Sequence, residues 1–321
     1  MFPTRRPFDD PALIDDLVTL RDWLRFAVSA FTKAGLVFGH GTSRAVDEAA
    51  FLLLSTLNLP HDELDPWLDC RLSRHERTEV LAILTRRVEA RIPAPYLTRS
   101  AYIGPYKFYC DERVIVPRSF IGELLDRDGL FAAVADPDSV EHVLDLCTGS
   151  GCLAILAAHA FPPARVDAAD LSADALDVAR RNVSDYRLDK RISLHQGDLY
   201  GAIGDARYDL IISNPPYVTE ASATAFPPEY KAEPRMAHVG GADGLDLVRR
   251  ILDQAPDHLT ADGMLVVEIG EAREALEAAY PHLPFLWLDT EESEGEVFAV
   301  SRTDLVGKPQ RSKKSSSGKR A

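Results

Sequence analysis

The sequence predicts an α/β protein in which a domain built on a mostly parallel sheet follows a small helical domain. Three observations lead to this prediction. Residues 12–90 show the apolar spacing of helices, the chain from residue 141 alternates between strand-like and helix-like segments, and a glycine-rich loop follows the first of those strands. We expect four segments along the 321 residues. They are a helical bundle at 1–92, a hairpin linker at 93–118, the sheet domain at 119–302 and a basic tail at 303–321.

The N-terminal region carries the patterns of three helices. Apolar residues recur on one helix face over 13–28, and a second apolar run covers 45–57. Ser73 and Glu76 stand three residues apart before a third apolar run, which is the capping-box arrangement of a helix start. This region holds no cluster of catalytic side chains. We expect the bundle either to recognise a substrate or only to stabilise the fold.

The linker differs in composition from the helices before it. Its residues are dense in aromatic rings and turn formers: Pro93, Pro95, Tyr96, Tyr102, Pro105, Tyr106, Phe108 and Tyr109. Such a segment favours short strands or a hairpin between two domains.

The remainder of the chain alternates between strands and helices. This rhythm is typical of an α/β domain with a mostly parallel sheet. The expected strands lie at 143–147, 166–170, 192–194, 208–213 and 264–269, and the clearest helices at 153–160 and 172–183.

The formal net charge of −14 is distributed unevenly. Residues 302–321 contain seven basic side chains and one acidic side chain, a local charge of +6, so the other 301 residues carry −20. An acidic body argues against a general nucleic-acid binder, which would present a basic face to phosphates. Two interpretations of the tail stay open: a weak contact with nucleic-acid phosphates through counterion release, or a disordered, solubilising end.

The cysteines and the N-terminus indicate the cellular setting. Four cysteines in a chain of this length do not make a disulfide framework. Cys147 and Cys152 are close, but no further histidine or cysteine completes a zinc set, so we predict no metal site. The chain begins without an apolar targeting segment, and no apolar run approaches the length of a membrane span. We therefore expect a cytoplasmic protein without membrane contact and with reduced thiols.

The loop after the first strand of the sheet domain has the features of a cofactor site. Gly149, Gly151 and Ala154 fit the loose G-x-G-x-x-G/A pattern, in which glycines let the backbone turn tightly and approach a ligand. Asp170 ends the next strand, where an acid can bind ribose hydroxyls. A nicotinamide-dependent dehydrogenase and a methyltransferase both need such an acid, so the loop alone leaves the cofactor undecided.

Asp145 favours the methyltransferase. A carboxylate at the strand end, four residues before Gly149, would repel a pyrophosphate, whereas it suits the amino group and sulfonium of S-adenosylmethionine. The pattern D-x-x-x-G-x-G resembles that of Rossmann-like methyltransferases that use this cofactor. The remaining alternative is a glycine turn that binds no cofactor.

A second motif, Asn214-Pro215-Pro216-Tyr217, follows the strand at 208–213. Asn-Pro-Pro alone is an ordinary turn, but the carboxyl end of a strand is where open α/β sheets bind ligands. An amide nitrogen or an exocyclic amine is a poor nucleophile, because its lone pair is delocalised. Two acceptors, the Asn214 side-chain oxygen and the Pro215 carbonyl, can hold its N–H bonds, while Tyr217 offers an aromatic face.

The tetrad resembles the Asn/Asp-Pro-Pro-Tyr/Phe motif of amino-methyltransferases, and residues 10–302 resemble the HemK family of protein glutamine methyltransferases. This resemblance implies a Rossmann-like class I methyltransferase domain with a seven-stranded sheet, and S-adenosylmethionine as cofactor. Within the family the chain is similar to the branch that methylates N5 of a glutamine in ribosomal protein L-three of the large subunit. The matching segments are 94–97, 111–119, 144–152, 214–217, 229–234 and 241–245.

The resemblance also implies roles for individual residues. Asp170 binds the ribose hydroxyls of the cofactor, and Asp198 and Leu199 flank its adenine. The methionine end is lined by Thr148, Gly149, Ser150 and Gly151. The tetrad Asn214, Pro215, Pro216 and Tyr217 is the catalytic motif, in which Asn214 and Pro215 hold the target amide and Tyr217 packs against it. Asn214 also belongs to the residues expected to bind the cofactor.

Three other functions stay open at this point. Methylation of release factors uses the same chemistry, but that branch usually has Pro-Arg-Pro-Asp-Thr-Glu where this chain has residues 117–123 in a different sequence. Adenine-N6 methylation shares the tetrad, although we find no target-recognition segment for nucleic acid. A nicotinamide-dependent oxidoreductase, or a silent nucleotide-binding module, has no use for the tetrad.

Three further residues are notable outside these motifs. Arg118 is expected to form an ion pair between domains, with a contact to substrate or cofactor as the alternative. Glu268 either closes the pocket or is a buried acid whose hydrogen bonds are satisfied. His238 follows the tetrad in a loop, and we expect it on the surface.

Overall fold

The computed structural model describes the chain except residues 1–7, 9, 128, 135, 291–292 and 308–321. All basic residues of the predicted tail fall at 308–321, outside the described residues. A weak contact with ribosomal RNA and a disordered, solubilising end therefore both stay predictions. Residues 303–305, which we expected in the tail, instead belong to a short helix, α12 (Arg302–Leu305). Within the described part of the chain, no helix is long and apolar enough to cross a bilayer.

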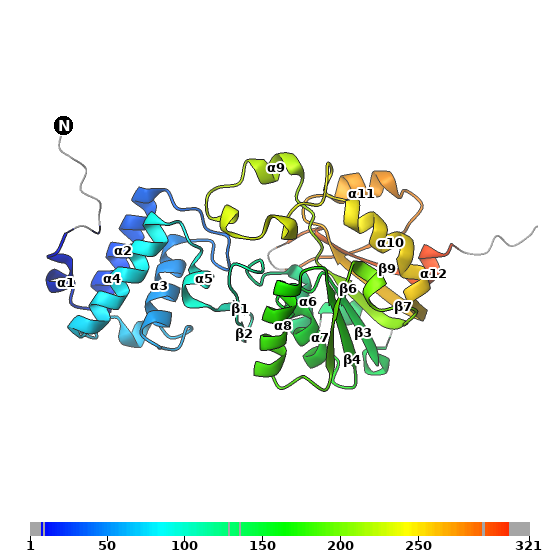
Figure 1. The fold of residues 1–321 in the computed structure, drawn as a ribbon, viewed down its shortest axis with the longest axis horizontal. Coiled ribbons are helices and arrows are strands. Elements are labelled where there is room, and N and C mark those ends of the chain that lie inside the picture. Colours follow the sequence, from blue (N-terminus) through cyan, green and yellow to red (C-terminus); the bar gives the residue numbers. More distant parts are fainter. Residues whose placement is uncertain (1–7, 9, 128, 135, 291–292, 308–321) are drawn as a thin grey trace, which may run out of the picture.

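Helices α1 to α4 form an N-terminal bundle, at the left of Figure 1. In α4, Ser73 and Glu76 exchange hydrogen bonds at the helix start, which confirms the predicted capping box. The bundle has its own apolar core, which includes Trp23, Phe31 and Leu52. The bounds are α1 Leu13–Asp16, α2 Leu20–Ala34, α3 Ala45–Thr56 and α4 Arg74–Glu89.

A short helix and a hairpin connect the bundle to the sheet domain. Helix α5 (Ala94–Thr98) is followed by β1 (Ala101–Ile103) and β2 (Tyr106–Phe108). The two strands pair antiparallel, with Ala101 opposite Phe108, which confirms the predicted hairpin. An extended stretch then leads to α6 (Phe120–Asp126).

The second half of the chain forms a seven-stranded sheet with the order β5-β4-β3-β6-β7-β9-β8. Strands β3 to β7 run parallel, and β9 runs antiparallel to both β7 and β8, which confirms the predicted mostly parallel sheet. The chain adds β4 and β5 on one side of β3 and then returns to place β6 on the other side. Such a reversal leaves a ligand crevice at the carboxyl ends of the strands. The bounds are β3 His142–Leu146, β4 Arg165–Asp170, β5 Ile192–Gln196, β6 Tyr208–Ser213, β7 Leu259–Glu268, β8 Leu286–Leu288 and β9 Val297–Ser301.

Helices cover both faces of the sheet (Figure 1). Alternating side chains of a strand point to opposite faces, so Val143 of β3 packs with one apolar cluster and Leu144 and Leu146 with the other. The first cluster includes side chains of α6, α7 and α8, and the second includes those of α10 and α11. The bounds are α7 Cys152–Ala160, α8 Ala173–Asp185, α10 Asp246–His258 and α11 Arg273–Ala279.

A long loop joins β6 to α10 and reaches the N-terminal bundle. It begins with the tetrad and contains the short helix α9 (Glu220–Thr224), at the top of Figure 1. Its Glu229 accepts hydrogen bonds from the backbone N–H of Val37 and from the guanidinium of Arg91. The loop therefore connects the tetrad to the helical bundle.

Candidate active site

The glycine loop turns between β3 and α7 in the way its sequence predicts. Gly149 and Gly151 have φ of +55° and +79°, the left-handed region that favours glycine. A Cβ on Gly151 would lie 3.1 Å from the Cβ of Ala179 on α8, so this glycine also permits close packing. Asp170 accepts hydrogen bonds from the backbone N–H of Gly149 at 2.9 Å and of Ser172 at 2.8 Å. The carboxyl end of β4 thus holds the loop against the start of α8.

Asp145 lies beneath this loop, fully buried. Its Oδ2 accepts hydrogen bonds from the hydroxyl of Thr148 at 2.5 Å and from the backbone N–H of Ala154 at 3.0 Å. Burial raises the pKa of Asp145 to about 7, more than these bonds lower it. Its Oδ1 has no hydrogen-bond partner among the described residues. The structure therefore places this carboxylate as a support of the loop, and it does not line the adjacent cavity.

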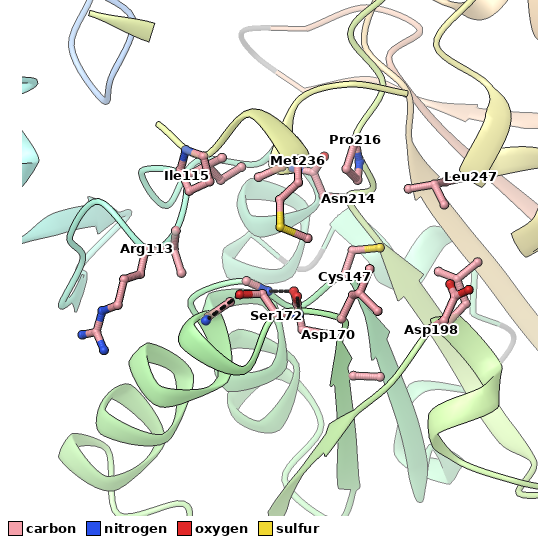
Figure 2. A pocket seen from close by; sticks show the side chains of 18 of the residues that line it. Arg113, Ile115, Cys147, Asp170, Ser172, Asp198, Asn214, Pro216, Met236 and Leu247 are labelled. Atoms are coloured by element: carbon pink, nitrogen blue, oxygen red, sulfur yellow. Dashed lines mark hydrogen bonds between the residues drawn. The ribbon is translucent and has the colours of Figure 1, made fainter. Parts of the chain in front are cut away.

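A cavity lies at the carboxyl ends of β3, β4, β5 and β6 (Figure 2). Asp170 forms its floor in this view, and Asn214 and Met236 lie above it. Two carboxylates, Asp170 and Asp198, lie among apolar side chains such as Leu247. This set suits a nucleoside with an attached amino acid, since carboxylates accept ribose hydroxyls and apolar surfaces cover a flat base.

The cavity brings together about half of the residues predicted to bind the cofactor. Its walls include Gly149, Asp170, Asp198, Leu199 and Asn214, and Pro216 of the catalytic tetrad lines it as well. Thr148 and Ser150 are buried within the loop and do not line this cavity. Gly151 directly precedes α7. Pro215 is also buried, and Tyr217 faces a different cavity.

Two residues of the cavity wall adopt the left-handed conformation although they are not glycines. Cys147 has φ +60° and Leu199 has φ +49°, and both follow the carboxyl end of a strand. Non-glycine residues in this region carry strain and gather at functional sites. Sequence reasoning also missed most of the other lining residues, and Ile115, Met236 and Leu247 are examples. They stand far from the glycine loop in sequence, and their apolar side chains look like ordinary core.

The tetrad starts where β6 ends. The Ser213 hydroxyl donates to the carbonyl of Leu146 on β3, which fixes the end of β6 beside the glycine loop. The Nδ2 of Asn214 donates to the main-chain carbonyl of Arg118 at 3.5 Å. This bond leaves the side-chain oxygen of Asn214 free to accept a hydrogen bond from a ligand.

Tyr217 lies on a second cavity, of about 700 Å³, between the helical bundle and the sheet domain. Its hydroxyl donates to Glu268 at 3.2 Å, and Glu268 also accepts from the Ser119 hydroxyl and the Phe120 backbone N–H. Burial raises the pKa of Glu268 to about 7 despite these bonds. The structure agrees with the expectation of a buried acid whose hydrogen bonds are satisfied, and it places Glu268 on the wall of the second cavity rather than the first.

Arg118 forms the ion pair that the sequence led us to expect. Its guanidinium pairs with Glu233, on the loop that follows the tetrad, and both nitrogen–oxygen distances are 2.8 Å. His238 lies on the same loop, and our expectation that it is on the surface is wrong. It is 7% exposed, and its Nε2 lies 3.0 Å from Oε2 of Glu233. A loop position predicts exposure poorly when a buried carboxylate needs partners.

No group of histidine, cysteine or acidic side chains in the described ranges has the arrangement of a metal site. The arrangement consists instead of two cavities that meet at the tetrad, one suited to a nucleoside and the other open to a larger partner. Together with the sheet order, these features define a class I methyltransferase. A family model described as methyltransferase small domain matches residues 128–226.

Relatives that match about 90% of the chain identify the family within this class of enzymes. The chain is 54% identical over 295 residues to the ribosomal protein uL3 glutamine methyltransferase of Bradyrhizobium diazoefficiens, covering 90% of this chain and 92% of that protein. It is 54% identical over 292 residues to the protein of the same name from Neisseria gonorrhoeae, covering 91% and 97%. The chain belongs to the family of ribosomal protein uL3 glutamine methyltransferases. Among solved structures, a Pyrococcus furiosus methyltransferase aligns with 61% of this chain and 88% of its own, at 17% identity and a TM-score of 0.45.

Proposed function

We propose that this protein transfers a methyl group from S-adenosylmethionine to the side-chain amide nitrogen of a glutamine in ribosomal protein uL3. The observation that carries the proposal is the position of the tetrad between two cavities, in a chain whose full-length relatives bear this activity in their names. With a substrate of the large ribosomal subunit, we expect the reaction to take place in the cytoplasm.

Residues of the first cavity would hold the cofactor, which supplies an activated methyl group when bound. Asp170 accepts the ribose hydroxyls, and its existing bonds to Gly149 and Ser172 keep its carboxylate in place. Asp198 and Leu199 of the cavity wall would flank the base, and Asp198 also pairs with Arg250 at 2.8 Å. Thr148, Ser150 and Gly151 act on the methionine end through the shape of the loop.

Residues of the tetrad would orient the glutamine. The side-chain oxygen of Asn214 and the carbonyl oxygen of Pro215 accept the two N–H bonds of the amide, which positions its nitrogen for attack. Proline contributes no N–H that would compete for these acceptors. The Tyr217 ring packs against the flat amide, and its bond to Glu268 fixes the ring. The amide keeps both protons until the new N–C bond forms, so the site needs no strong base, and the product cation then loses one proton.

Intact-protein mass spectrometry tests the proposal. Purified uL3 and the release factors are each incubated with the enzyme and S-adenosylmethionine, beside the variant Asn214→Ala. We expect one methyl group on uL3, located on a glutamine by fragmentation, and none with the variant. Methylation of a release factor alone would move the protein to the sister branch. Protease-resistant methyl transfer to nucleic acid, with uL3 unmodified, would contradict the proposal.

A further inference from the structure

One buried carboxylate outside the tetrad joins three parts of the molecule. The side chain of Glu233 is fully buried and lies on the loop after the tetrad. It accepts hydrogen bonds from the backbone N–H of Val116 and from both terminal nitrogens of Arg118, all at 2.8 Å. It also lies 3.0 Å from Nε2 of His238 on its own loop and 3.5 Å from Nε2 of His40, which belongs to the helical bundle.

These contacts keep Glu233 ionised. Burial alone would raise its pKa, but the hydrogen bonds from Arg118, together with the nearby rings of His238 and His40, outweigh burial and hold the pKa far below its usual range. A charge-assisted, two-point pair between a guanidinium and a carboxylate restricts both partners in position and angle. The stretch from Val116 to Arg118 is therefore clamped at its backbone and at its side chain.

The clamped stretch contacts the tetrad directly. The main-chain carbonyl of Arg118 accepts the hydrogen bond from Nδ2 of Asn214. A carboxamide has one donor end and one acceptor end, so anchoring the nitrogen decides where the oxygen points. If the Arg118 carbonyl moved, the Asn214 amide could turn and present N–H groups to a substrate amide that itself needs acceptors.

We propose that Glu233 is a positioning residue for methyl transfer: it holds Arg118 so that Asn214 presents its oxygen to the glutamine amide. Through His40 it also makes this arrangement depend on the docking of the helical bundle. The inference rests on the proposed function, because its main readout is methylation of uL3. Glu233 touches neither reacting group in this scheme and acts only through Arg118.

The variant Glu233→Gln tests this role in the full-length chain. The amide keeps the size of the side chain but removes its charge and turns N–H groups toward Arg118. We expect kcat for uL3 methylation to fall by about tenfold or more, as when a preorganised acceptor is misplaced. Calorimetric affinity for S-adenosylhomocysteine should stay within about twofold, because Glu233 lies outside the first cavity. A residue that only stabilises the fold would lower the melting temperature and leave kcat of the folded fraction unchanged.

Glu220→Gln is the matched control. Glu220 lies on the same loop and pairs with Arg235, but both side chains are exposed. We expect kcat within about twofold of the parent enzyme, since exposed ion pairs hold little in place. A tenfold loss in the control would show that any charge change on this loop disturbs catalysis, and would overturn the specific role of Glu233.

A second variant keeps the proposal testable if Glu233→Gln does not fold. Arg118→Gln removes the same pair from the other side, and its kcat should fall to a similar extent. Where both single variants fold, the double variant should be no slower than the slower single one, because both changes break one chain of contacts. Full activity of either folded single variant, or strictly additive losses, would overturn the inference. Inactivity of the parent enzyme on uL3 would instead overturn the proposed function.

Discussion

Buried carboxylates surround the tetrad, and their surroundings set their acidity in opposite directions. Glu233 faces a guanidinium and two histidines, so it stays ionised. Asp145 and Glu268 accept only neutral donors, and burial raises the pKa of each to about 7. At Asp145 and Glu268 neutral donors compensate the loss of water only in part, whereas at Glu233 the opposite charge of Arg118 outweighs it. The consequence is that stability and site geometry depend on pH through Asp145 and Glu268.

Stability should fall between pH 4.5 and 7 because of Glu268. Its folded pKa of about 7 exceeds its ordinary value of 4.5, so the native state binds a proton in this window that the unfolded state has released. The unfolding free energy therefore decreases as pH rises, by roughly 3 kcal/mol from this group alone at 1.36 kcal/mol per pKa unit. Urea unfolding of the parent protein and of Glu268→Gln at pH 5 and pH 8 measures the effect.

The variant should show a smaller difference between the two pH values. Asp145 has the same sign of shift and remains in the variant, so part of the pH dependence must persist. An unchanged difference in Glu268→Gln would mean that this carboxyl group titrates normally in the folded protein.

Sequence reasoning at the residue level succeeds for local motifs and fails for partners that are distant in the chain. The glycine loop and the tetrad are each a continuous stretch of sequence. In both, the residue types themselves indicate the backbone conformation or the hydrogen bonds that the position requires. Glu233 and His40 stand 193 residues apart, and neither local sequence contains a pattern that predicts their contact. The expectation for His238 is wrong although Glu233 is only five residues away, because Glu233 is itself buried by its distant partners Arg118 and His40.

At the level of elements, the turn into α7 should be intolerant of a side chain. Gly151 needs φ +79°, and a Cβ there would lie 3.1 Å from the Cβ and 3.3 Å from the Cα of Ala179. Gly151→Ala should lower the unfolding free energy by about 1–3 kcal/mol, from backbone strain and from displacement of α8. It should also weaken binding of S-adenosylhomocysteine, because the glycine loop leads directly into α7 and Asp170 is bonded to Ser172 at the start of α8. Urea unfolding and calorimetry measure the two effects.

Gly201→Ala is the comparison for this prediction. A Cβ at Gly201 would have no neighbouring atom within 4 Å, and this glycine does not have a positive φ. Its replacement should change the unfolding free energy by less than about 0.5 kcal/mol. If the two alanine variants were equally stable, close packing at Gly151 would not be the reason for the glycine.

The elements that could be predicted are those with a strong repeat or a recognisable start. Strands β3 and β6 are mostly apolar, and α4 begins with its capping box. The antiparallel strands β8 and β9 escaped prediction. They are short, at three and five residues, and an acidic stretch separates them, so neither presents a clear period. Their place at the sheet edge is decided by pairing with β7, a long-range contact.

The whole molecule depends on a buried ionic cluster between the bundle and the loop after the tetrad. Arg87 of α4 is fully buried and donates to Glu48 of α3 at 2.7 Å. Its Nη1 also lies 3.5 Å from Glu229, which pairs with Arg91 at 2.9 Å. From their charge alone, such residues would be expected on the solvated faces of helices. The acidic loop and the basic end of α4 instead neutralise each other inside the molecule.

Removing the Arg87 side chain should therefore weaken both the helical bundle and its contact with the loop that follows the tetrad. Arg87→Ala leaves Glu48 buried without its partner, and burial already raises the pKa of that carboxyl. Breaking a buried pair from one side costs about 3–5 kcal/mol, so we expect a loss of this size in the unfolding free energy. Hydrogen exchange should become faster both in α3 and in residues 226–238.

The exposed pair of Arg21 and Asp69 provides the control, and Arg21→Ala should leave the unfolding midpoint and the exchange of residues 226–238 unchanged. Faster exchange in α3 with an unaltered loop would show that the cluster stabilises the bundle without transmitting its position to the tetrad.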